Sequence, residues 1–225
     1  MYTYLILNVF IIFVTFLLFL FNFINLRKYY LAFLISISSI GIIFIIWDYF
    51  STQSKIWSFN NDFITNIKII GLPFEEILFF ITVPFSCIVI YEIFNAKIKE
   101  KVLNLDTNVF YIMISILILF SLIFFQKNYT RNVLFSVAIS IMLILLLNRK
   151  IFLSANYWRS IIFCYLPFLI VNTTLTMLPI VLYNNLDTWG IRIISIPLED
   201  FFYSFSLLST NIAIYDLVKR KFNII

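Results

Sequence analysis

The sequence has no histidine, and among its 225 residues there are only three glycines and two cysteines. Histidine is the commonest protein ligand for metals and the usual base near neutral pH, so we predict no metal site. Three glycines are too few for the loops that cradle phosphates or dinucleotides, and we predict no cofactor. Cys87 and Cys164 fall inside apolar segments, which is typical of small buried side chains and gives no disulfide framework.

Charge is also scarce: 12% of the residues are charged, 63% are hydrophobic, and the mean hydropathy is +1.03. A soluble domain is closer to half apolar and a quarter charged. The composition therefore predicts an integral membrane protein whose spans take up most of the chain. The net charge of +5 comes from Lys and Arg clusters beside apolar runs, where lipid headgroups explain them, so we predict no binding of nucleic acid.

Seven segments are apolar over most of the roughly 20 residues that a helix needs to cross a bilayer. They cover residues 2–24, 29–50, 73–94, 108–125, 131–148, 159–182 and 196–218. The first lacks the basic region and cleavage site of a signal peptide, so we expect it to be retained. The sequence thus predicts an all-α fold with about seven transmembrane helices.

Lys and Arg are unevenly divided between the two sides of the membrane that these spans define. Eleven lie on the side of the C-terminus and five on the other. Positive charge favours the cytoplasm, so we predict a multi-pass protein of the cell (plasma or inner) membrane, with the N-terminus outside and the C-terminus cytoplasmic. The eleven are Arg27, Lys28, Lys97, Lys99, Lys101, Arg149, Lys150, Arg159, Lys219, Arg220 and Lys221.

One block of sequence occurs twice, as residues 70–76 (IGLPFEE) and residues 194–200 (ISIPLED), at an offset of 124 residues. The same offset places Asp48 on Asn172 and Lys68 on Arg192. We therefore predict that residues 1–104 form a first repeat of three spans, 105–127 a linker span, and 128–225 a second repeat. Three spans and a linker return the chain to its starting side, so the repeats are parallel and related by a pseudo-two-fold axis along the membrane normal.

Each copy of the block ends in two carboxylates at the start of an apolar span: Glu75 with Glu76, and Glu199 with Asp200. Acids after a proline also form an ordinary helix start. Successive helical residues point about 100° apart, so either Glu75 with Glu199 or Glu76 with Asp200 would converge across the axis. A carboxyl group in apolar surroundings keeps its proton to higher pH than usual, which makes it a candidate proton donor.

Other residues at the same membrane level could support this chemistry. Asp48 is either a solvated interfacial acid or a third carboxylate that tunes the pair, and Arg192 either snorkels to the surface or holds one carboxylate ionised. Aromatic residues there belong either to an interfacial belt or to a pocket whose π faces stabilise a cation. The predicted pocket residues are Phe74, Phe79, Phe80, Phe202 and Tyr203.

The first block and its continuation (residues 71–80, 83–85 and 91–92) resemble one motif of the non-flavin, integral-membrane lycopene cyclases, and residues 196–203 resemble the other. Residues 47–48, residues 57–60 and Arg192 fit the same pattern. The resemblance covers nearly the whole chain and is to a fused form of the two-subunit bacterial and archaeal lycopene β-cyclases.

The resemblance implies a redox-neutral isomerase (an intramolecular lyase) of carotenoid biosynthesis that needs no cofactor. An acid protonates the terminal double bond of a ψ end group of lycopene, the neighbouring double bond closes a six-membered ring, and loss of a proton gives the β-ring. Lycopene is then the substrate, membrane lipid the surroundings, and other enzymes of the carotenoid pathway the expected partners.

On this interpretation Glu75, Glu76, Glu199 and Asp200 form the acid–base set, and we expect Glu75 or Glu199 to donate the proton. Asp48 has only Asn172 as its equivalent, so the two repeats need not be equally active. Two alternatives stay open. Intramembrane acids on parallel repeats also suit a proton-coupled membrane carrier of a lipophilic solute. A related carotenoid hydratase would use the same acid chemistry to add water.

Overall fold

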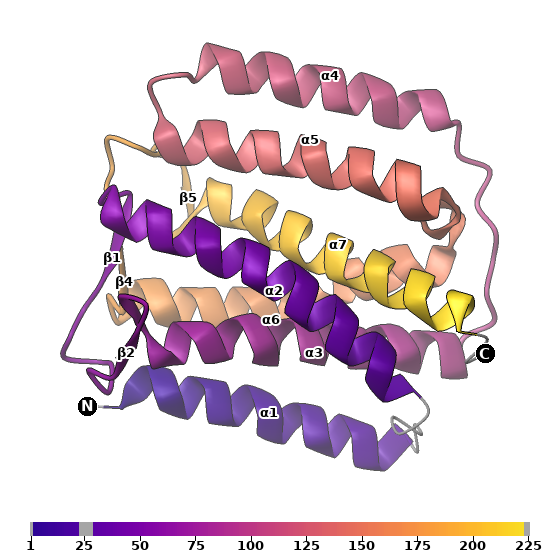
Figure 1. Cartoon of the computed structure of the whole chain (residues 1–225), viewed down its shortest axis with the longest axis horizontal. Helices are drawn as coiled ribbons and strands as arrows, with labels where there is room; N and C mark the ends of the chain where they lie inside the picture. The colour runs from indigo at the N-terminus through magenta and orange to yellow at the C-terminus, as the bar shows by residue number, and fades with distance from the viewer. Residues whose placement is uncertain (1, 23–28, 223–225) are drawn as a thin grey trace.

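The computed structural model describes residues 2–22 and 29–222, and its helices run side by side along the long axis of the molecule (Figure 1). The helices are α1 (Thr3–Asn22), α2 (Tyr30–Gln53), α3 (Phe74–Lys97), α4 (Thr107–Ile123), α5 (Asn128–Asn148), the 3₁₀ helix η2 (Arg149–Leu153), α6 (Ala155–Met177) and α7 (Leu198–Lys221). The strands are β1 (Trp57–Phe59), β2 (Lys68–Ile69), β3 (Leu72–Pro73), β4 (Val181–Tyr183), β5 (Arg192–Ile193) and β6 (Ile196–Pro197).

Each of the seven predicted spans corresponds to one α-helix, and the prediction of an all-α membrane protein is confirmed. Within the described residues, six helices are long and apolar enough to cross a membrane. The seventh, α4, has 17 residues, or about 25 Å at 1.5 Å per residue, and packs along α5. The chain is therefore an integral membrane protein.

Several predicted span ends were wrong by a few residues. The sixth span begins at Ala155 rather than residue 159 and ends at Met177, because the last residues predicted for it form β4 and pair with β1. Likewise, residues 196–197 belong to β6, and α5 begins at Asn128 rather than residue 131. Residues 23–24 of the first predicted span, and Arg27 and Lys28 of the charge count, lie outside the described residues.

The two termini lie at opposite ends of the helical bundle (Figure 1). The paired strands β1 to β6 all lie at the end where α1 begins, which is termed the strand end. The other end, where α7 finishes, is termed the C-terminal end. Both acidic blocks, at the starts of α3 and α7, are therefore at the strand end.

The elements recur at the offset of the sequence repeat. Helix α3 begins and ends 124 residues before α7, and β1, β2 and β3 precede β4, β5 and β6 by the same interval. Strands β1 and β4 pair antiparallel with Ser58 opposite Leu182, its own equivalent. When a strand pairs antiparallel with its own counterpart and the central residues of the two strands face each other, a two-fold axis relates the two strands. The division at residues 104 and 127 stays a prediction that this geometry supports.

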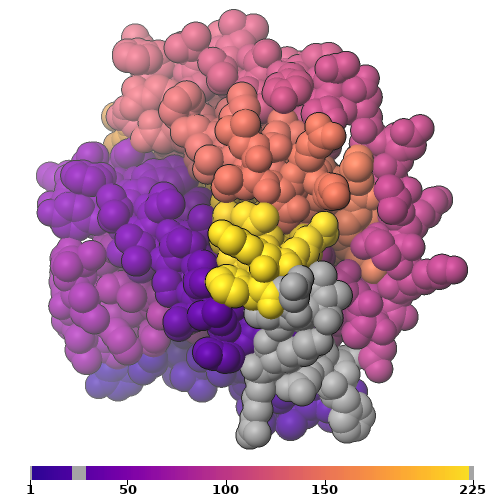
Figure 2. Space-filling model, turned by 45° about the vertical axis from the view of Figure 1, so that its right-hand side comes forward, coloured from indigo at the N-terminus to yellow at the C-terminus, as the bar shows by residue number. Residues whose placement is uncertain are grey.

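Helix packing follows the same pseudo-symmetry. Helix α1 packs on α3 as α5 packs on α7, while α2 packs on α7 and α6 packs on α3. The second helix of each repeat thus lies against the last helix of the other repeat. Viewed toward the C-terminal end, the last turns of α7 lie between the purple residues of the first half and the salmon residues of α5 (Figure 2). Helices α3 and α7 therefore form the centre of the bundle.

Tight hairpins set the start of both central helices. Between β2 and β3, Ile70 and Gly71 have φ angles of 48° and 87°, and a turn with positive φ at both central residues matches the twist of a hairpin. The equivalent Ile194, between β5 and β6, has a φ of 61°. A branched residue in this region is strained, and the strain recurs at one equivalent position. Each hairpin ends on a proline, Pro73 or Pro197, immediately before the helix.

Candidate active site

Glu75 and Glu199 hold a loop to the start of each central helix. The Oε1 atom of Glu75 accepts the backbone N–H of Thr65 at 2.5 Å, and that of Glu199 accepts the backbone N–H of Trp189, the equivalent residue, at 2.5 Å. Both carboxyl groups are buried, at 0% and 2% exposed. Their Oε2 atoms are buried without a hydrogen-bond partner. This pair fixes the loops at the strand end and does not line the cavity described next.

Glu76 and Asp200 face a common cavity between α1, α3, α6 and α7. Because the next helical position is turned by about 100°, these side chains point away from the loops that their neighbours hold. The cavity has a volume of about 120 Å³ and is lined mostly by apolar side chains. An engineered apolar cavity of about 150 Å³ in another protein binds benzene, so this space is large enough to admit a ring-sized group. The structure therefore brings Glu76 and Asp200 together and leaves Glu75 and Glu199 outside.

Tyrosine hydroxyl groups hold both of these carboxyl groups. Tyr4, in the first turn of α1, donates to Glu76 Oε2 at 2.5 Å. Tyr129, in the first turn of α5, donates to Asp200 Oδ1 at 2.6 Å, and Tyr183 of β4 donates to Asp200 Oδ2 at 2.9 Å. Both oxygens of Asp200 thus have a phenol donor. Glu76 lines the cavity, and no described residue makes a hydrogen bond to its other oxygen, Oε1. The two acids differ in how fully they are bonded.

Tyr183 lies outside the membrane-spanning helices. Burial raises the pKa of its phenol well above the usual value of 10, and the negative charge of Asp200 raises the pKa further. Tyr183 therefore keeps its proton throughout the physiological pH range and stays a hydrogen-bond donor to Asp200.

A third carboxyl group, that of Asp48, lines the cavity near the end of α2 and is 1% exposed. Its Oδ1 accepts the indole N–H of Trp57 at 2.7 Å, while its Oδ2 is buried without a partner. The equivalent Asn172 also lines the cavity, and its amide donates to the backbone of Phe168 at 3.2 Å. The cavity thus has an acidic side chain on the α2 side and an amide on the α6 side.

Aromatic rings form much of the wall near the acids. The ring centroids of Trp57 and Tyr129 are 5.1 Å apart, and those of Tyr129 and Tyr183 are 5.7 Å apart in a stacked arrangement. Tyr203 lies 6.4 Å from Trp57, with the rings edge to face. Electron-rich ring faces of this kind stabilise a cation placed between them.

Two of the five predicted pocket residues, Phe79 and Tyr203, line the cavity. The other three, Phe74, Phe80 and Phe202, do not. Phe80 is 1% exposed and packs with the core cluster around α2, α3 and α7 instead. The prediction used membrane depth alone, which does not say on which side of a helix an aromatic residue lies.

Arg192 makes no ion pair with a carboxylate of the described chain. Its guanidinium donates to the backbone oxygen of Ser195 at 2.8 Å and to the side chain of Asn185 at 3.2 Å. The guanidinium carbon lies 5.9 Å from the ring centroid of Tyr183. Arg192 is exposed, and its guanidinium lies over the ring of the tyrosine that donates to Asp200. Its predicted role in holding a carboxylate ionised stays a prediction.

The sequence analysis missed Tyr4 and Tyr129. Tyr4 and Tyr129 are each the second residue of their helix, but they are 125 residues apart. An alignment at 124 residues hides the pair. A search that allowed a one-residue shift would have found two tyrosines at the start of equivalent apolar spans.

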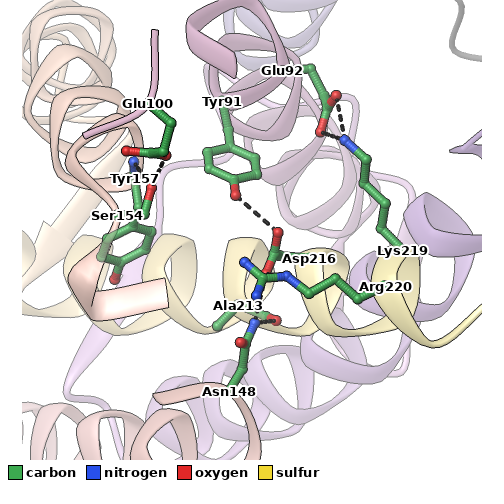
Figure 3. A network of polar contacts seen from close by, with 10 residues as sticks. All are labelled: Tyr91, Glu92, Glu100, Asn148, Ser154, Tyr157, Ala213, Asp216, Lys219 and Arg220. Carbon is green, nitrogen blue, oxygen red and sulfur yellow. Dashed lines mark hydrogen bonds and ion pairs between the residues drawn. The ribbon is translucent and has the colours of Figure 1, made fainter. Parts of the chain in front are cut away.

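A second polar network, shown in Figure 3, lies at the C-terminal end, and none of its residues lines the cavity. Lys219 donates to both oxygens of Glu92 at 2.8 and 2.9 Å. The Tyr91 hydroxyl and the Asn148 amide donate to Asp216, each at 3.0 Å. These contacts join α3, α5 and α7, the helices that carry the acids or their phenol donors, at the far end from the site.

A family model described as lycopene cyclase matches residues 1–94 and 126–218, which is most of the chain. The matched segments include both acidic blocks, all the cavity-lining carboxyl groups and their three tyrosine donors. No curated protein and no solved structure matches the chain significantly.

Proposed function

The chain belongs to the lycopene cyclase family, and on this premise we propose that it is a lycopene β-cyclase, an isomerase that closes the ψ end groups of lycopene into β-rings. Family membership supports a carotenoid cyclase. The ring type and the residue roles below are our proposal.

The observation that carries the proposal is the pair Glu76 and Asp200, which face one apolar cavity from equivalent positions of the two repeats. A redox-neutral cyclisation needs one group that gives a proton and one that takes it back. It also needs walls that exclude water, because water would trap a carbocation. Two carboxyl groups, aromatic walls and a position within the bundle of membrane spans supply each of these.

We assign the proton donor to Glu76. Glu76 lines the cavity and its Oε1 has no hydrogen bond from a described residue, so this oxygen is the one we expect to give a proton to a substrate double bond. The terminal double bond takes this proton, and a tertiary carbocation forms while Glu76 becomes a carboxylate. The electron pair of the neighbouring double bond then forms the ring bond and moves the cation into the ring, beside the faces of Trp57 and Tyr203.

We assign the proton acceptor to Asp200. Two phenols donate to its two oxygens, and charge-assisted hydrogen bonds of this kind stabilise a carboxylate. Asp200 takes a proton from the ring carbon next to the cation, and the released electron pair forms the ring double bond. The proton returns from Asp200 to Glu76 before the next turnover, since the net reaction neither adds nor removes one. Asp48, the third acid of the cavity, has one oxygen without a hydrogen-bond partner, and we assign it the relay of this proton.

The expected orientation follows from the charge count: the strand end, with the acids, lies toward the outside, and the C-terminal end lies in the cytoplasm. The cell membrane as the site of action, and contacts with other carotenoid-pathway enzymes, are parts of the same proposal. No cofactor is assigned to the reaction.

The proposal is tested by expressing the chain in cells that accumulate lycopene and identifying the pigments by chromatography and mass. We expect products of unchanged mass with β-rings. A product heavier by one water would instead assign a hydratase. Unchanged lycopene in cells whose membranes contain the protein would contradict the proposal and leave the membrane carrier, which predicts solute flux driven by a pH gradient.

A further inference from the structure

The cavity is much longer than the end group that reacts in it. Along α3, its lining runs from Glu76 to Ile90, a rise of about 21 Å at 1.5 Å per residue. Along α6 it runs from Cys164 to Leu175, or about 16 Å. The acids occupy only the strand end of this length. The remainder is a narrow apolar channel toward the middle of the helices.

One residue that lines the channel is also exposed on the side of the bundle, within the span of a membrane helix. Pro167, in the middle of α6, lines the cavity and is exposed on the outside of the bundle. On the other side of the opening, Ile11 of α1 is half-buried. The Thr15 and Ser86 hydroxyls are 2.6 Å apart and join α1 to α3, so the opening lies between α1 and α6 with α3 as its floor.

Contacts made by α6 flank this opening on both sides along the helix. At the strand end, Tyr4 of α1 and Val171 and Leu175 of α6 belong to one buried cluster. Toward the C-terminal end, the rings of Phe94 and Phe163 meet at 5.8 Å between α3 and α6. The mouth therefore sits at the depth of the hydrocarbon core, where a dissolved polyene would lie.

The opposite repeat has no such connection. Ile43, the equivalent of Pro167, is 57% exposed on α2 and does not line the cavity. Ile40, Thr210 and Ile214, the equivalents of Cys164, Ser86 and Ile90, line a separate pocket whose lining includes none of the acids. The pseudo-symmetric fold thus opens the acid-bearing cavity on one side only.

We propose that a linear polyene hydrocarbon enters sideways from the lipid, between α1 and α6 at Pro167, and that its uncyclised part lies along α3 between the acids and Ile90. This inference rests on the proposed function for the identity of the polyene. It makes Pro167 and Ile90 residues that determine access and substrate length. It also implies that one end group reacts at a time, because a single channel leads to a single pair of acids.

Binding can be measured apart from turnover, because Trp57 lines the cavity and a bound polyene quenches tryptophan fluorescence. In the Glu76→Gln background, lycopene in lipid vesicles should quench the purified protein. Adding Pro167→Phe, which narrows the mouth, should raise the lycopene concentration for half-quenching at least tenfold. The matched change Ile43→Phe, at the equivalent exposed position, should shift that concentration less than twofold. Equal quenching by both double variants would overturn the lateral path.

Substrate length gives a second measurement in the otherwise unaltered chain. Ile90→Trp fills the deep end of the channel, so turnover of lycopene should fall at least tenfold. A shortened linear isoprenoid with the same end group should still be cyclised within about twofold of the unaltered rate, which also shows that the variant is folded. Normal turnover of lycopene by Ile90→Trp would overturn the channel. If the unaltered protein binds lycopene through the mouth and cyclises nothing, the proposed function fails and the path stands.

Discussion

Glu75 and Glu76 are neighbours in sequence, yet their surroundings differ completely. Successive helical residues point about 100° apart, so the Glu75 carboxyl group accepts the backbone N–H of Thr65 while Glu76 lines the cavity. The same separation occurs at Glu199 and Asp200. A carboxyl group bonded to a fixed loop amide cannot reach a substrate, whereas one with a free oxygen in a cavity can. The expected donor thus moves from Glu75 or Glu199 to Glu76.

Replacing each acid with its amide tests this assignment. Glu76→Gln removes the acid and keeps the shape, so cyclisation should fall by about 10²–10⁴-fold, the usual contribution of a general acid. Glu75→Gln keeps an oxygen that can accept the Thr65 N–H, so its rate should stay within about tenfold of the unaltered enzyme. The measurement is the initial rate of β-ring formation at equal protein in the membrane. The reverse order of effects would return the donor role to Glu75.

The phenol donors of Asp200 form the next residue-scale test. Tyr129→Phe removes one hydrogen bond to the carboxylate, a bond to a charged group worth about 1.5–3 kcal/mol. The rate should fall about tenfold or more because the proton acceptor is less well held. Tyr91→Phe is a matched control, since its hydroxyl donates to Asp216 at the C-terminal end. That variant should lose similar stability and little activity; an equal loss of activity in both would reduce Tyr129 to a structural role.

The tyrosines also mark the limit of the sequence analysis at this scale. The repeated acids are visible because a short polar block stands out in an apolar sequence. A tyrosine in the first turn of an apolar span looks the same whether it belongs to an interfacial belt or points at a carboxyl group. Only the packing of α1 on α3, and of α5 on α7, decides which, and no single-helix pattern contains that information.

At the scale of elements, the central helices α3 and α7 are held at both ends by different chemistry. At the strand end, hairpins and the loop-holding acids fix where they start. At the C-terminal end, Lys219 of α7 pairs with Glu92 of α3, and the side chains are 13% and 6% exposed. Removal of one partner from a buried pair leaves an uncompensated charge, which is far more costly than loss of a surface pair.

This contrast predicts that substitutions at two neighbouring residues of α7 lower the free energy of unfolding by different amounts. Lys219→Met should lower the free energy of unfolding by about 3–5 kcal/mol, because Glu92 stays buried without its cation. Arg220→Gln, which breaks the pair of a 41% exposed arginine with Asp216, should cost less than about 1 kcal/mol. Thermal unfolding in one detergent measures both. Equal shifts would mean that water reaches Glu92.

The lengths of the apolar segments correctly predicted which helices exist and in what order, but they did not predict where each helix ends. The predicted sixth span ran on to residue 182 because residues 178–182 are as apolar as the helix before them. Helix α6 stops at Met177, and β4 forms a few residues later because it pairs with β1 of the other repeat. Long-range pairing of this kind overrides local hydropathy. It also supplies Tyr183, whose place at the site could not be read from its own segment.

At the scale of the whole molecule, the site belongs to neither repeat alone. Glu76, Tyr4 and Asp48 come from the first repeat, and Asp200, Tyr129 and Tyr183 from the second. The pseudo-two-fold axis brings equivalent acids together, and the differences between the repeats then separate their roles. Asp48 has Asn172 opposite, and the lateral mouth exists on the α6 side alone. The approximate symmetry places equivalent residues of both repeats around one cavity. The differences between the repeats let one acid give the proton and the other take it back.

A shared site predicts that the chain can be divided and reassembled. Fragments 1–104 and 105–225 would be held together by α2 against α7, α3 against α6, the β1–β4 pairing, and the backbone hydrogen bond of 2.7 Å from Leu103 to Leu153. Neither fragment has both Glu76 and Asp200, so each alone should leave lycopene unchanged. Expressed together, they should restore β-ring formation.

The control for this experiment places one substitution in each half. The first fragment with Glu76→Gln and the unaltered second fragment should co-purify and stay inactive, and the unaltered first fragment with Asp200→Asn in the second should do the same. Mixing these two inactive pairs should restore activity only if subunits exchange, because a complete site needs the unaltered residue from each half. Activity in either fragment by itself would mean that each repeat has its own acid and base, and the single shared chamber would have to be abandoned.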